Sequence, residues 1–194
     1  MGTLYNFNFG CKTLAELKEL YNITTFVETG CFYGDSLTFA RDRGFAKLYS
    51  CDIDLEMINH CQNRLGNDVE LFHGDSKTFF INLLPKLDPA ENVMFFLDAH
   101  LPGFDKTQGT SGVADVDANL NFPLQEEIKM IHMARRTQSD VIIVDDLRIY
   151  EDGPYGNGNW AERHQFGLSL DFLGTLSYNI QKFYADEGYL LLTR

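Results

Sequence analysis

The sequence predicts an α/β protein built on a doubly wound, mostly parallel sheet with helices on both faces. Five apolar segments, each followed by a helical pattern, are the first observation, because strands buried on both faces of a parallel sheet are apolar along their whole length. The second is a pair of apolar segments at the end of the chain, 178–184 and 189–193, which is typical of an antiparallel hairpin. Together they predict seven strands, the last two forming that C-terminal hairpin.

The chain of 194 residues is long enough for a substantial core, and we expect a single domain over 1–194. The formal net charge of -12 and the lack of a basic stripe argue against nucleic acid and anionic membrane surfaces as partners. No apolar run approaches membrane-spanning length. The 4 cysteines form no CxxC pair, so we expect reduced thiols and a cytoplasmic protein. A homo-oligomer stays open.

The first half of the chain alternates between strand and helix patterns. Leu14 and Leu17 share one helical face with Thr13 as its cap, and Gly44 and Gly66 end the two helices that follow. The expected helices are 13–21, 35–43, 55–65 and 76–84, and the expected strands are 23–28, 47–51 and 69–72.

The second half continues the alternation. The expected strands are 93–97 and 141–144, and the expected helices are 123–136 and 168–176. Leu124, Ile128 and Ile131 share one face of the first of these helices. Its early acids, Glu126 and Glu127, are interpreted as complementing the helix dipole.

Two long loops complete the pattern. The segment 101–121 is rich in Gly, Asp, Thr and Asn and is too long for an ordinary connector, so we expect a lid insertion there. The loop 151–159 contains three glycines and a proline. Its Tyr155 and the following Trp160 are interpreted either as walls of a ligand pocket or as packing anchors.

The segment 26–36, Phe-Val-Glu-Thr-Gly-Cys-Phe-Tyr-Gly-Asp-Ser, leads from the first strand into a helix. Gly30 and Gly34 favour a tight turn on which a ligand lies against bare backbone, and the helix start offers unpaired N–H groups. Two glycines after a strand are also typical of a plain turn. Ligands of parallel sheets bind beyond the carboxyl ends of the strands, and the acids of this sequence gather at that edge.

Two acids at this edge fit a nucleotide. Asp52 ends the second strand about twenty residues after Gly30, where a carboxylate hydrogen-bonds ribose hydroxyls. The alternative is a cap for the next helix, a role that Asp54 also fits. Asp75 either accepts from an adenine amino group or caps the helix behind it, and capping is the stronger alternative for Ser76.

With these residues the chain resembles the class I S-adenosylmethionine-dependent methyltransferases, closest in pattern to the metal-dependent group related to macrocin O-methyltransferase. The resemblance covers most of the chain. It rests on Glu28-Thr29-Gly30-Cys31-Phe32-Tyr33-Gly34, Asp52, Gly74-Asp75 and the closing hairpin. Phe32 stands where the family often has a third glycine, and the macrocin relatives tolerate larger residues there.

This resemblance implies a Rossmann-like methyltransferase fold and S-adenosylmethionine as the cofactor. It also implies that Glu28 reaches the methionine ammonium of the cofactor through water and that Gly30 lets the backbone touch the cofactor. The expected cofactor-binding residues are Glu28, Gly30, Gly34, Asp52, Asp75 and Ser76.

Three further acids follow neighbouring strands. Asp98 ends the strand 93–97, and Asp145 and Asp146 end the strand 141–144. Converging carboxylates repel one another unless a cation bridges them, and hard divalent cations favour oxygen ligands. We therefore expect Mg2+ or Mn2+ here, as in the catechol and macrocin-type O-methyltransferases that the arrangement resembles. The alternative is that these acids cap turns.

His100 lies two residues after Asp98, and the related enzymes place their general base shortly after this aspartate. A histidine titrates near neutral pH and accepts a hydroxyl proton. The alternative is a histidine hydrogen-bonded to the long loop. His164 is the reserve candidate for the base. The remaining three histidines, expected to be structural, are His60, His73 and His132.

The resulting hypothesis is a metal-assisted O-methyltransferase for a hydroxylated small molecule, a sugar or a secondary-metabolite moiety, with His100 and Asp98 as catalytic residues. Two alternatives stay open. One is a non-catalytic module that binds S-adenosylmethionine or drives oligomerisation. The other is an oxidoreductase with a dinucleotide, which the absence of GxGxxG disfavours.

Overall fold

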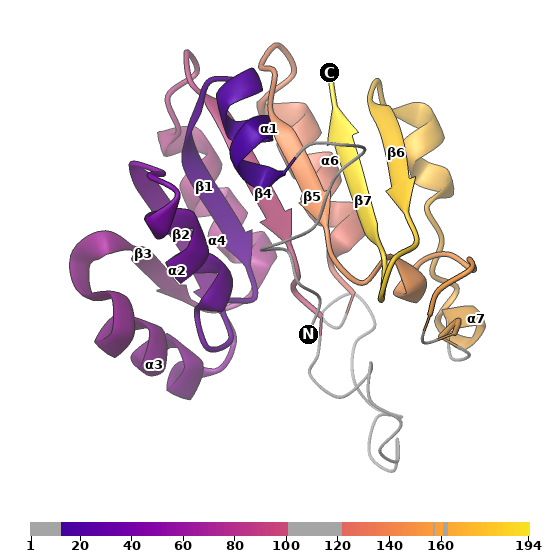
Figure 1. The fold of residues 1–194 in the computed structure, drawn as a ribbon, viewed down its shortest axis with the longest axis horizontal. Helices are drawn as coiled ribbons and strands as arrows, with labels where there is room; N and C mark the ends of the chain where they lie inside the picture. Colours follow the sequence, from indigo (N-terminus) through magenta and orange to yellow (C-terminus); the bar gives the residue numbers. More distant parts are fainter. Residues whose placement is uncertain (1–12, 101–121, 157, 161–162) are drawn as a thin grey trace.

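The computed structural model describes residues 13–100, 122–156, 158–160 and 163–194. The predicted lid at 101–121 lies outside these residues. The strands are β1 Ile23–Thr29, β2 Lys47–Asp52, β3 Glu70–His73, β4 Asn92–Leu97, β5 Val141–Val144, β6 Asn179–Phe183 and β7 Tyr189–Thr193. They form one 7-stranded sheet in the order β3-β2-β1-β4-β5-β7-β6 (Figure 1).

The pairing confirms the predicted fold class. β1 is parallel to β2 and β4, β2 to β3, and β4 to β5, whereas β7 is antiparallel to both β5 and β6. The α-helices are α1 Leu14–Leu20, α2 Asp35–Asp42, α3 Leu55–Leu65, α4 Ser76–Leu83, α6 Leu124–Ala134 and α7 Arg163–Phe166. The short 3-10 helices are η2 Gly66–Asp68, η3 Leu84–Lys86, η5 Leu147–Ile149 and η6 Asp171–Thr175.

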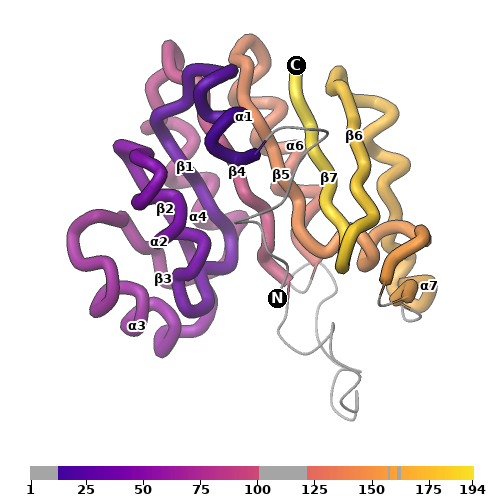
Figure 2. The backbone as a smooth tube through the Cα atoms, viewed as in Figure 1, coloured from indigo at the N-terminus to yellow at the C-terminus, as the bar shows by residue number. Residues whose placement is uncertain are grey.

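Helices cover the two faces of the sheet, with α1 and α2 on the near face and α4 and α6 on the far face of Figures 1 and 2. Because side chains alternate along a strand, each buried strand contributes to two cores. Phe26 packs with α1, α2 and α3, whereas its neighbour Val27 packs with α4 and α6. This double burial explains why β5 and all of β4 after Asn92 are apolar.

The prediction of an α-helix at 168–176 is wrong. The structure has α7 at Arg163–Phe166 and then only the 3-10 helix η6 at Asp171–Thr175, with Leu173 N–H donating to Leu170 O at 3.0 Å. Gly174 lies inside the segment, and glycine disfavours an α-helix by roughly 1 kcal/mol. The apolar spacing was therefore correct for packing against the core but not for the helix type.

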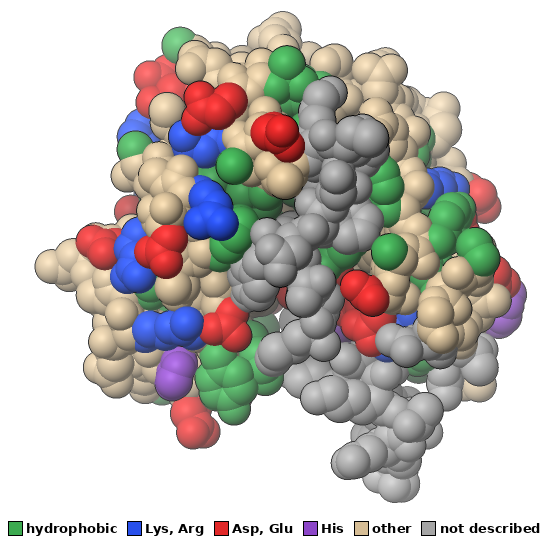
Figure 3. All heavy atoms as spheres, in the orientation of Figure 1, with side chains coloured by type: hydrophobic (Ala, Val, Ile, Leu, Met, Phe, Trp, Pro, Cys, Tyr) green, Lys and Arg blue, Asp and Glu red, His purple; other side chains and the backbone are tan. Residues whose placement is uncertain are grey.

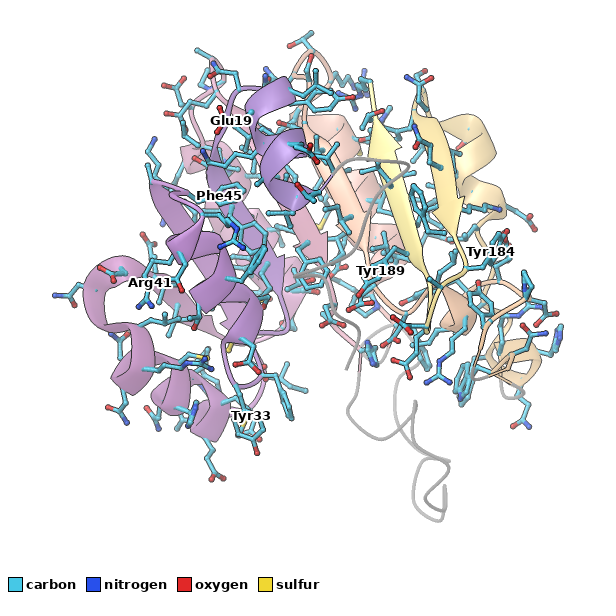
Figure 4. All side chains as sticks on the ribbon, viewed as in Figure 1. Glu19, Tyr33, Arg41, Phe45, Tyr184 and Tyr189 are labelled. Atoms are coloured by element: carbon cyan, nitrogen blue, oxygen red, sulfur yellow. The ribbon has the colours of Figure 1, made fainter. Side chains whose placement is uncertain are left out.

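All five parallel strands end at the same edge, the lower one in Figure 1. Tyr33, in the loop between β1 and α2, lies at this edge in Figure 4. On the face drawn in Figure 3, cationic side chains lie beside acidic ones. Arg64 and Asp35 form one of the surface ion pairs of the protein, at 2.6 Å. Within the described part of the chain, none of the helices is long and apolar enough to cross a membrane.

Candidate cofactor and metal site

The ends of β1, β4 and β5 lie level, and this register creates the site. Thr29 pairs with Leu97, and Leu97 pairs with Val144. The next residues along the three strands are Gly30, Asp98 and Asp145. Backbone pairing continues into this row, because Asp98 N–H donates to Thr29 O and Asp145 N–H donates to Leu97 O, both at 3.1 Å.

Gly30 is packed against the backbone that follows β4. A Cβ atom added to it would lie 2.8 Å from the carbonyl oxygen of Asp98 and 3.3 Å from Cα of Ala99. Its φ of +84° is also in the left-handed region. Glycine at this position thus brings the predicted cofactor turn into direct contact with the predicted metal ligand Asp98.

Asp52 ties the same turn to the end of β2. Its Oδ2 accepts the N–H of Phe32 at 3.0 Å, and its Oδ1 accepts the N–H of Asp54 at 2.9 Å. Phe32 has a φ of 44°, a backbone conformation that residues other than glycine rarely adopt. Asp54, not Asp52, caps α3 by accepting from Glu56 N–H at 2.8 Å. The capping alternative for Asp52 is therefore wrong, and its ribose role stays a prediction.

Asp75 and Ser76 begin α4 at the end of β3. Asp75 is the cap of α4, with its two oxygens accepting from the N–H of Thr78 at 2.9 Å and from the hydroxyl of Thr78 at 2.8 Å. Partial burial acts to raise the pKa of Asp75, but these hydrogen bonds together lower it. The capping interpretation of Asp75 is thus confirmed. Ser76 is the first residue of α4 and is buried at 5% exposure.

Glu28 is fully buried in β1, on the face covered by α2. Its carboxyl accepts from the hydroxyl of Ser36 in α2 and from that of Ser50 in β2, the latter at 2.9 Å. Burial raises the pKa of Glu28 to about 8, although both hydroxyls act to lower it. The contact of this acid with a cofactor ammonium through water stays a prediction.

The pKa of Glu28 makes a testable prediction for stability. The unfolded chain ionises this acid near pH 4.5, whereas the folded chain keeps it protonated until about pH 8. Ionisation of Glu28 therefore costs the folded state nothing below pH 4.5, and the free energy of unfolding falls as the pH rises from 4.5 to about 8. Each pKa unit corresponds to roughly 1.4 kcal/mol. We expect Glu28→Gln to gain a few kcal/mol relative to wild type between pH 5 and 8, measured by urea unfolding; parallel pH profiles would contradict this.

A second group of side chains lies beside Gly30. Asp98, His100 and Asp146 each place one ligand atom within 4.8 Å of the others. His100 Nδ1 lies 3.5 Å from Asp98 Oδ1, and His100 Nε2 lies 3.1 Å from Asp146 Oδ2. The imidazole thus lies between two carboxylates that come from different strands, a donor set that suits a divalent cation.

Asp145 lies outside this group. Its Oδ1 accepts the N–H of Asp146 at 2.8 Å, and burial, followed by the charge of Asp146, raises its pKa well above the ordinary value. The φ of 50° at Asp146 turns the chain sharply after β5. The structure therefore brings together Asp98 and Asp146 of the three predicted acids and adds His100, while a metal contact of Asp145 stays a prediction.

The other histidines have surroundings of different kinds. His164 is 69% exposed and lies 3.5 Å from Asp152. His60, His73 and His132 lie in α3, β3 and α6, inside elements as predicted. Among them, His132 Nδ1 lies 3.0 Å from the guanidinium of Arg194.

A pocket of about 190 Å³ lies beside the start of α6. It is lined by Phe122, Gln125, Glu126, Tyr150, Phe166, Gly167, Leu168, Ser169 and Phe172. Trp160 is buried and packs on Phe122 and Phe166, with ring centroids 5.6 Å and 5.9 Å away. Tyr155 is buried against Tyr184 instead. Tyr155 and Trp160 are therefore packing anchors, and Trp160 packs against two residues that line the pocket, Phe122 and Phe166.

No protein-family model matches the chain, and no curated protein matches it in sequence. Solved structures share its fold at low identity. TomG, an O-methyltransferase from Streptomyces achromogenes involved in tomaymycin synthesis and solved with S-adenosylmethionine, has a TM-score of 0.55 at 18% identity, over 93% of this chain and 77% of that one. An O-methyltransferase from Bacillus cereus, in complex with S-adenosylhomocysteine, has a TM-score of 0.61 at 13% identity, over 93% of this chain and 79% of that one. The methyltransferase PaMTH1 of Podospora anserina, also bound to S-adenosylhomocysteine, has a TM-score of 0.56 at 15% identity, over 92% of this chain and 75% of that one.

The chain has the Rossmann-like methyltransferase fold. The likeness extends over most of each matched chain. The predicted antiparallel hairpin at the end of the chain is confirmed, and the structure adds that β7 lies between β5 and β6. Within this fold, Gly30, Asp52 and Asp98 lie at the carboxyl edge, where parallel sheets bind ligands.

The structure also shows two buried residues near the carboxyl edge of the sheet that sequence reasoning missed. Glu127 was interpreted as a helix-dipole acid, but it is buried at 1% exposure. The signal was present, because Glu127 follows Leu124 by three residues and precedes Ile131 by four, which is the spacing of the buried face. Tyr150 is buried after β5, and burial raises its pKa well above the ordinary value. The charges of three acids add to this rise, and they are Glu127, Asp146 and Asp98.

Proposed function

We propose that this protein is an S-adenosylmethionine-dependent O-methyltransferase, assisted by a divalent cation, that acts on a hydroxylated small molecule such as a sugar or a secondary-metabolite moiety. The observation that carries the proposal is the contact of Gly30 with the backbone of Asp98. This contact places the turn at Gly30, which suits the cofactor, beside Asp98, His100 and Asp146, whose side chains are of the kinds that bind metal ions. The presence of S-adenosylmethionine in TomG and of its demethylated product in the Bacillus cereus enzyme supports the choice of cofactor.

The residues at the turn fit such a cofactor. Both glycines let the turn pack closely, because a Cβ at Gly30 would lie 2.8 Å from the carbonyl oxygen of Asp98 and one at Gly34 would lie 2.9 Å from Cys61 Sγ. α2 begins directly after this turn, so its first N–H groups lie at the same edge. Asp52 uses two of its acceptor sites on backbone N–H groups, and a carboxylate has about four. It therefore retains capacity for ribose hydroxyls. The bound cofactor would supply the electrophilic methyl group.

The acids and the imidazole fit a divalent cation. Carboxylates suit magnesium and manganese, whereas imidazole suits the transition metals. A set made of Asp98, Asp146 and His100 therefore favours Mn2+ over Mg2+. The cation would act as a Lewis acid towards the hydroxyl group of the acceptor.

His100 also fits the role of general base. It lies between two carboxylates at 13% exposure, with Nδ1 3.5 Å from Asp98 Oδ1 and Nε2 3.1 Å from Asp146 Oδ2. Only a neutral imidazole that does not itself ligate the cation can accept the proton of the acceptor hydroxyl. In this role His100 would leave the cation to Asp98 and Asp146, and their charges would stabilise the imidazolium. Orienting the hydroxyl towards the methyl group would supply much of the remaining acceleration.

The test is thermal unfolding with Mn2+, with Mg2+ and with EDTA. We expect Mn2+ to stabilise the wild type, by roughly 2.7 kcal/mol at a hundredfold excess over the dissociation constant. Asp146→Asn should lose most of this gain. Asp145→Asn tests the third predicted ligand: because its carboxyl lies outside the group, this variant should keep the gain, and a loss equal to that of Asp146→Asn would show that Asp145 also contacts the cation.

The same proteins should be assayed for S-adenosylhomocysteine release with a panel of hydroxylated acceptors. Wild type that binds cofactor without any cation-dependent shift would refute metal assistance. Cofactor binding without turnover of any acceptor would favour the non-catalytic module instead.

A further inference from the structure

Glu127 is a buried acid on which the charge of Lys77 acts only from outside ion-pair distance. It lies on the inner face of α6 at 1% exposure, and it forms no ion pair in the described part of the chain. Burial raises the pKa of Glu127 to about 7. Burying an acid in this way is costly. An apolar residue at this position would continue the stripe of Leu124, Ile128 and Ile131 without that cost.

Two hydroxyl groups at the carboxyl edge of the sheet face this acid. One belongs to Thr29, the residue before Gly30, and the other to Ser76, the residue after Asp75. Both lie close enough to the carboxyl to oppose the rise of its pKa. Yet within the described residues Glu127 Oε1 and Thr29 Oγ1 have no hydrogen-bond partner. The three side chains thus form a buried polar cluster with unused hydrogen-bonding capacity.

The position of this cluster points to the nucleoside part of the cofactor. Thr29 directly precedes Gly30 of the predicted cofactor turn, and Ser76 is the first residue of α4. Asp75, the acid expected to accept from the adenine amino group, caps α4 with both oxygens bonded to Thr78. Glu127, which is also close to Ser76, has a buried oxygen with no hydrogen-bond partner among the described residues.

We propose that Glu127, with Ser76 and Thr29, recognises the amino edge of the adenine ring of the cofactor. This inference rests on the proposed function and adds the residues that select the base. The exocyclic amine of adenine donates two N–H groups, which a carboxyl oxygen accepts. The Ser76 hydroxyl both donates and accepts, so it suits a ring nitrogen. Hypoxanthine carries a carbonyl oxygen in place of the amine. At pH 8, above the pKa of about 7 of Glu127, the acid is ionised and this oxygen would face its carboxylate unfavourably, so the comparison is made at that pH.

The test is calorimetric binding of S-adenosylhomocysteine and of its hypoxanthine analogue, S-inosylhomocysteine. We expect the wild type to prefer the adenine compound by about tenfold or more, the cost of one mismatched hydrogen bond at a buried site. Glu127→Leu should weaken the adenine compound and abolish the preference. Glu127→Gln should abolish the preference but keep affinity for both, because an amide either accepts from the amine or donates to the carbonyl oxygen.

Glu126→Gln is the matched control. Glu126 is the neighbouring acid, is exposed, and pairs with Lys129 at 3.3 Å, so this substitution should keep the full preference. Wild type that binds both compounds equally, or a Glu127→Gln variant with unchanged preference, would overturn the assignment while leaving the proposed function intact. Absence of binding of either compound to the wild type would overturn the proposed function itself.

Discussion

Replacing Gly30 with alanine is expected to destabilise the protein by several kcal/mol and to remove cofactor binding. The new Cβ would lie 2.8 Å from the carbonyl oxygen and 3.2 Å from the carbonyl carbon of Asp98. Both are backbone atoms, so no side-chain rotation relieves the collision. The φ of +84° adds a cost of roughly 1–2 kcal/mol for any residue with a Cβ. The end of β4 must move, and Asp98 moves with it.

Gly44→Ala separates these two effects. Gly44 has a φ of +73°, and a Cβ there would meet no atom within 4 Å. This variant should therefore lose only the conformational part and keep full affinity for S-adenosylhomocysteine. Urea unfolding and calorimetry on both variants measure the difference. Equal losses of stability in the two variants would show that contact with Asp98 contributes nothing.

The sequence contains enough information to place the sheet and its binding edge. Continuous apolar runs at β4 and β5, together with the closing hairpin, predict the strand types, and acids in or just after the last residues of the parallel strands mark the edge. The level register of Thr29, Leu97 and Val144 then brings Gly30 and Asp98 together. This part succeeded because parallel sheets with helical crossovers have few alternatives.

Side-chain direction after a strand is not contained in such patterns. The grouping of Asp146, rather than Asp145, with Asp98 accompanies a left-handed backbone at Asp146, which no periodicity reports. The role of Glu127 was missed for a different reason. Acids in a first helical turn usually complement the helix dipole, and only tertiary packing shows that this one faces Thr29 and Ser76.

The opposite edge of the sheet holds an ion pair whose loss should be the largest purely structural effect. Arg135 binds Asp140 through two hydrogen bonds, Nε to Oδ2 at 2.7 Å and Nη2 to Oδ1 at 3.0 Å, and both side chains are less than 5% exposed. Asp140 Oδ1 also accepts the N–H of Val93 at 2.8 Å, at the start of β4. The guanidinium donates to the carbonyl of Glu91 at 2.5 Å as well. The pair therefore joins the end of α6 to the starts of β4 and β5.

Arg135→Ala is expected to cost roughly 3–5 kcal/mol, because it leaves the Asp140 carboxylate buried without its cation. For a chain of this size the melting temperature should fall by about 10 °C. Breaking the exposed pair with Glu126→Gln should cost less than about 1 kcal/mol. Removing both charges, with Arg135→Met and Asp140→Leu together, should cost less than the sum of the single changes, since no charge is then left unpaired.

Because this pair lies at the amino edge, Arg135→Ala should leave the affinity for S-adenosylhomocysteine unchanged at temperatures where the variant is folded. Melting by circular dichroism and calorimetric binding on the same samples provide both measurements. A loss of affinity in the folded variant would mean that the two edges of the sheet are coupled through β4. In that case the stability of the amino edge would also determine the position of Asp98, and the Gly30 and Arg135 variants would be expected to show non-additive effects.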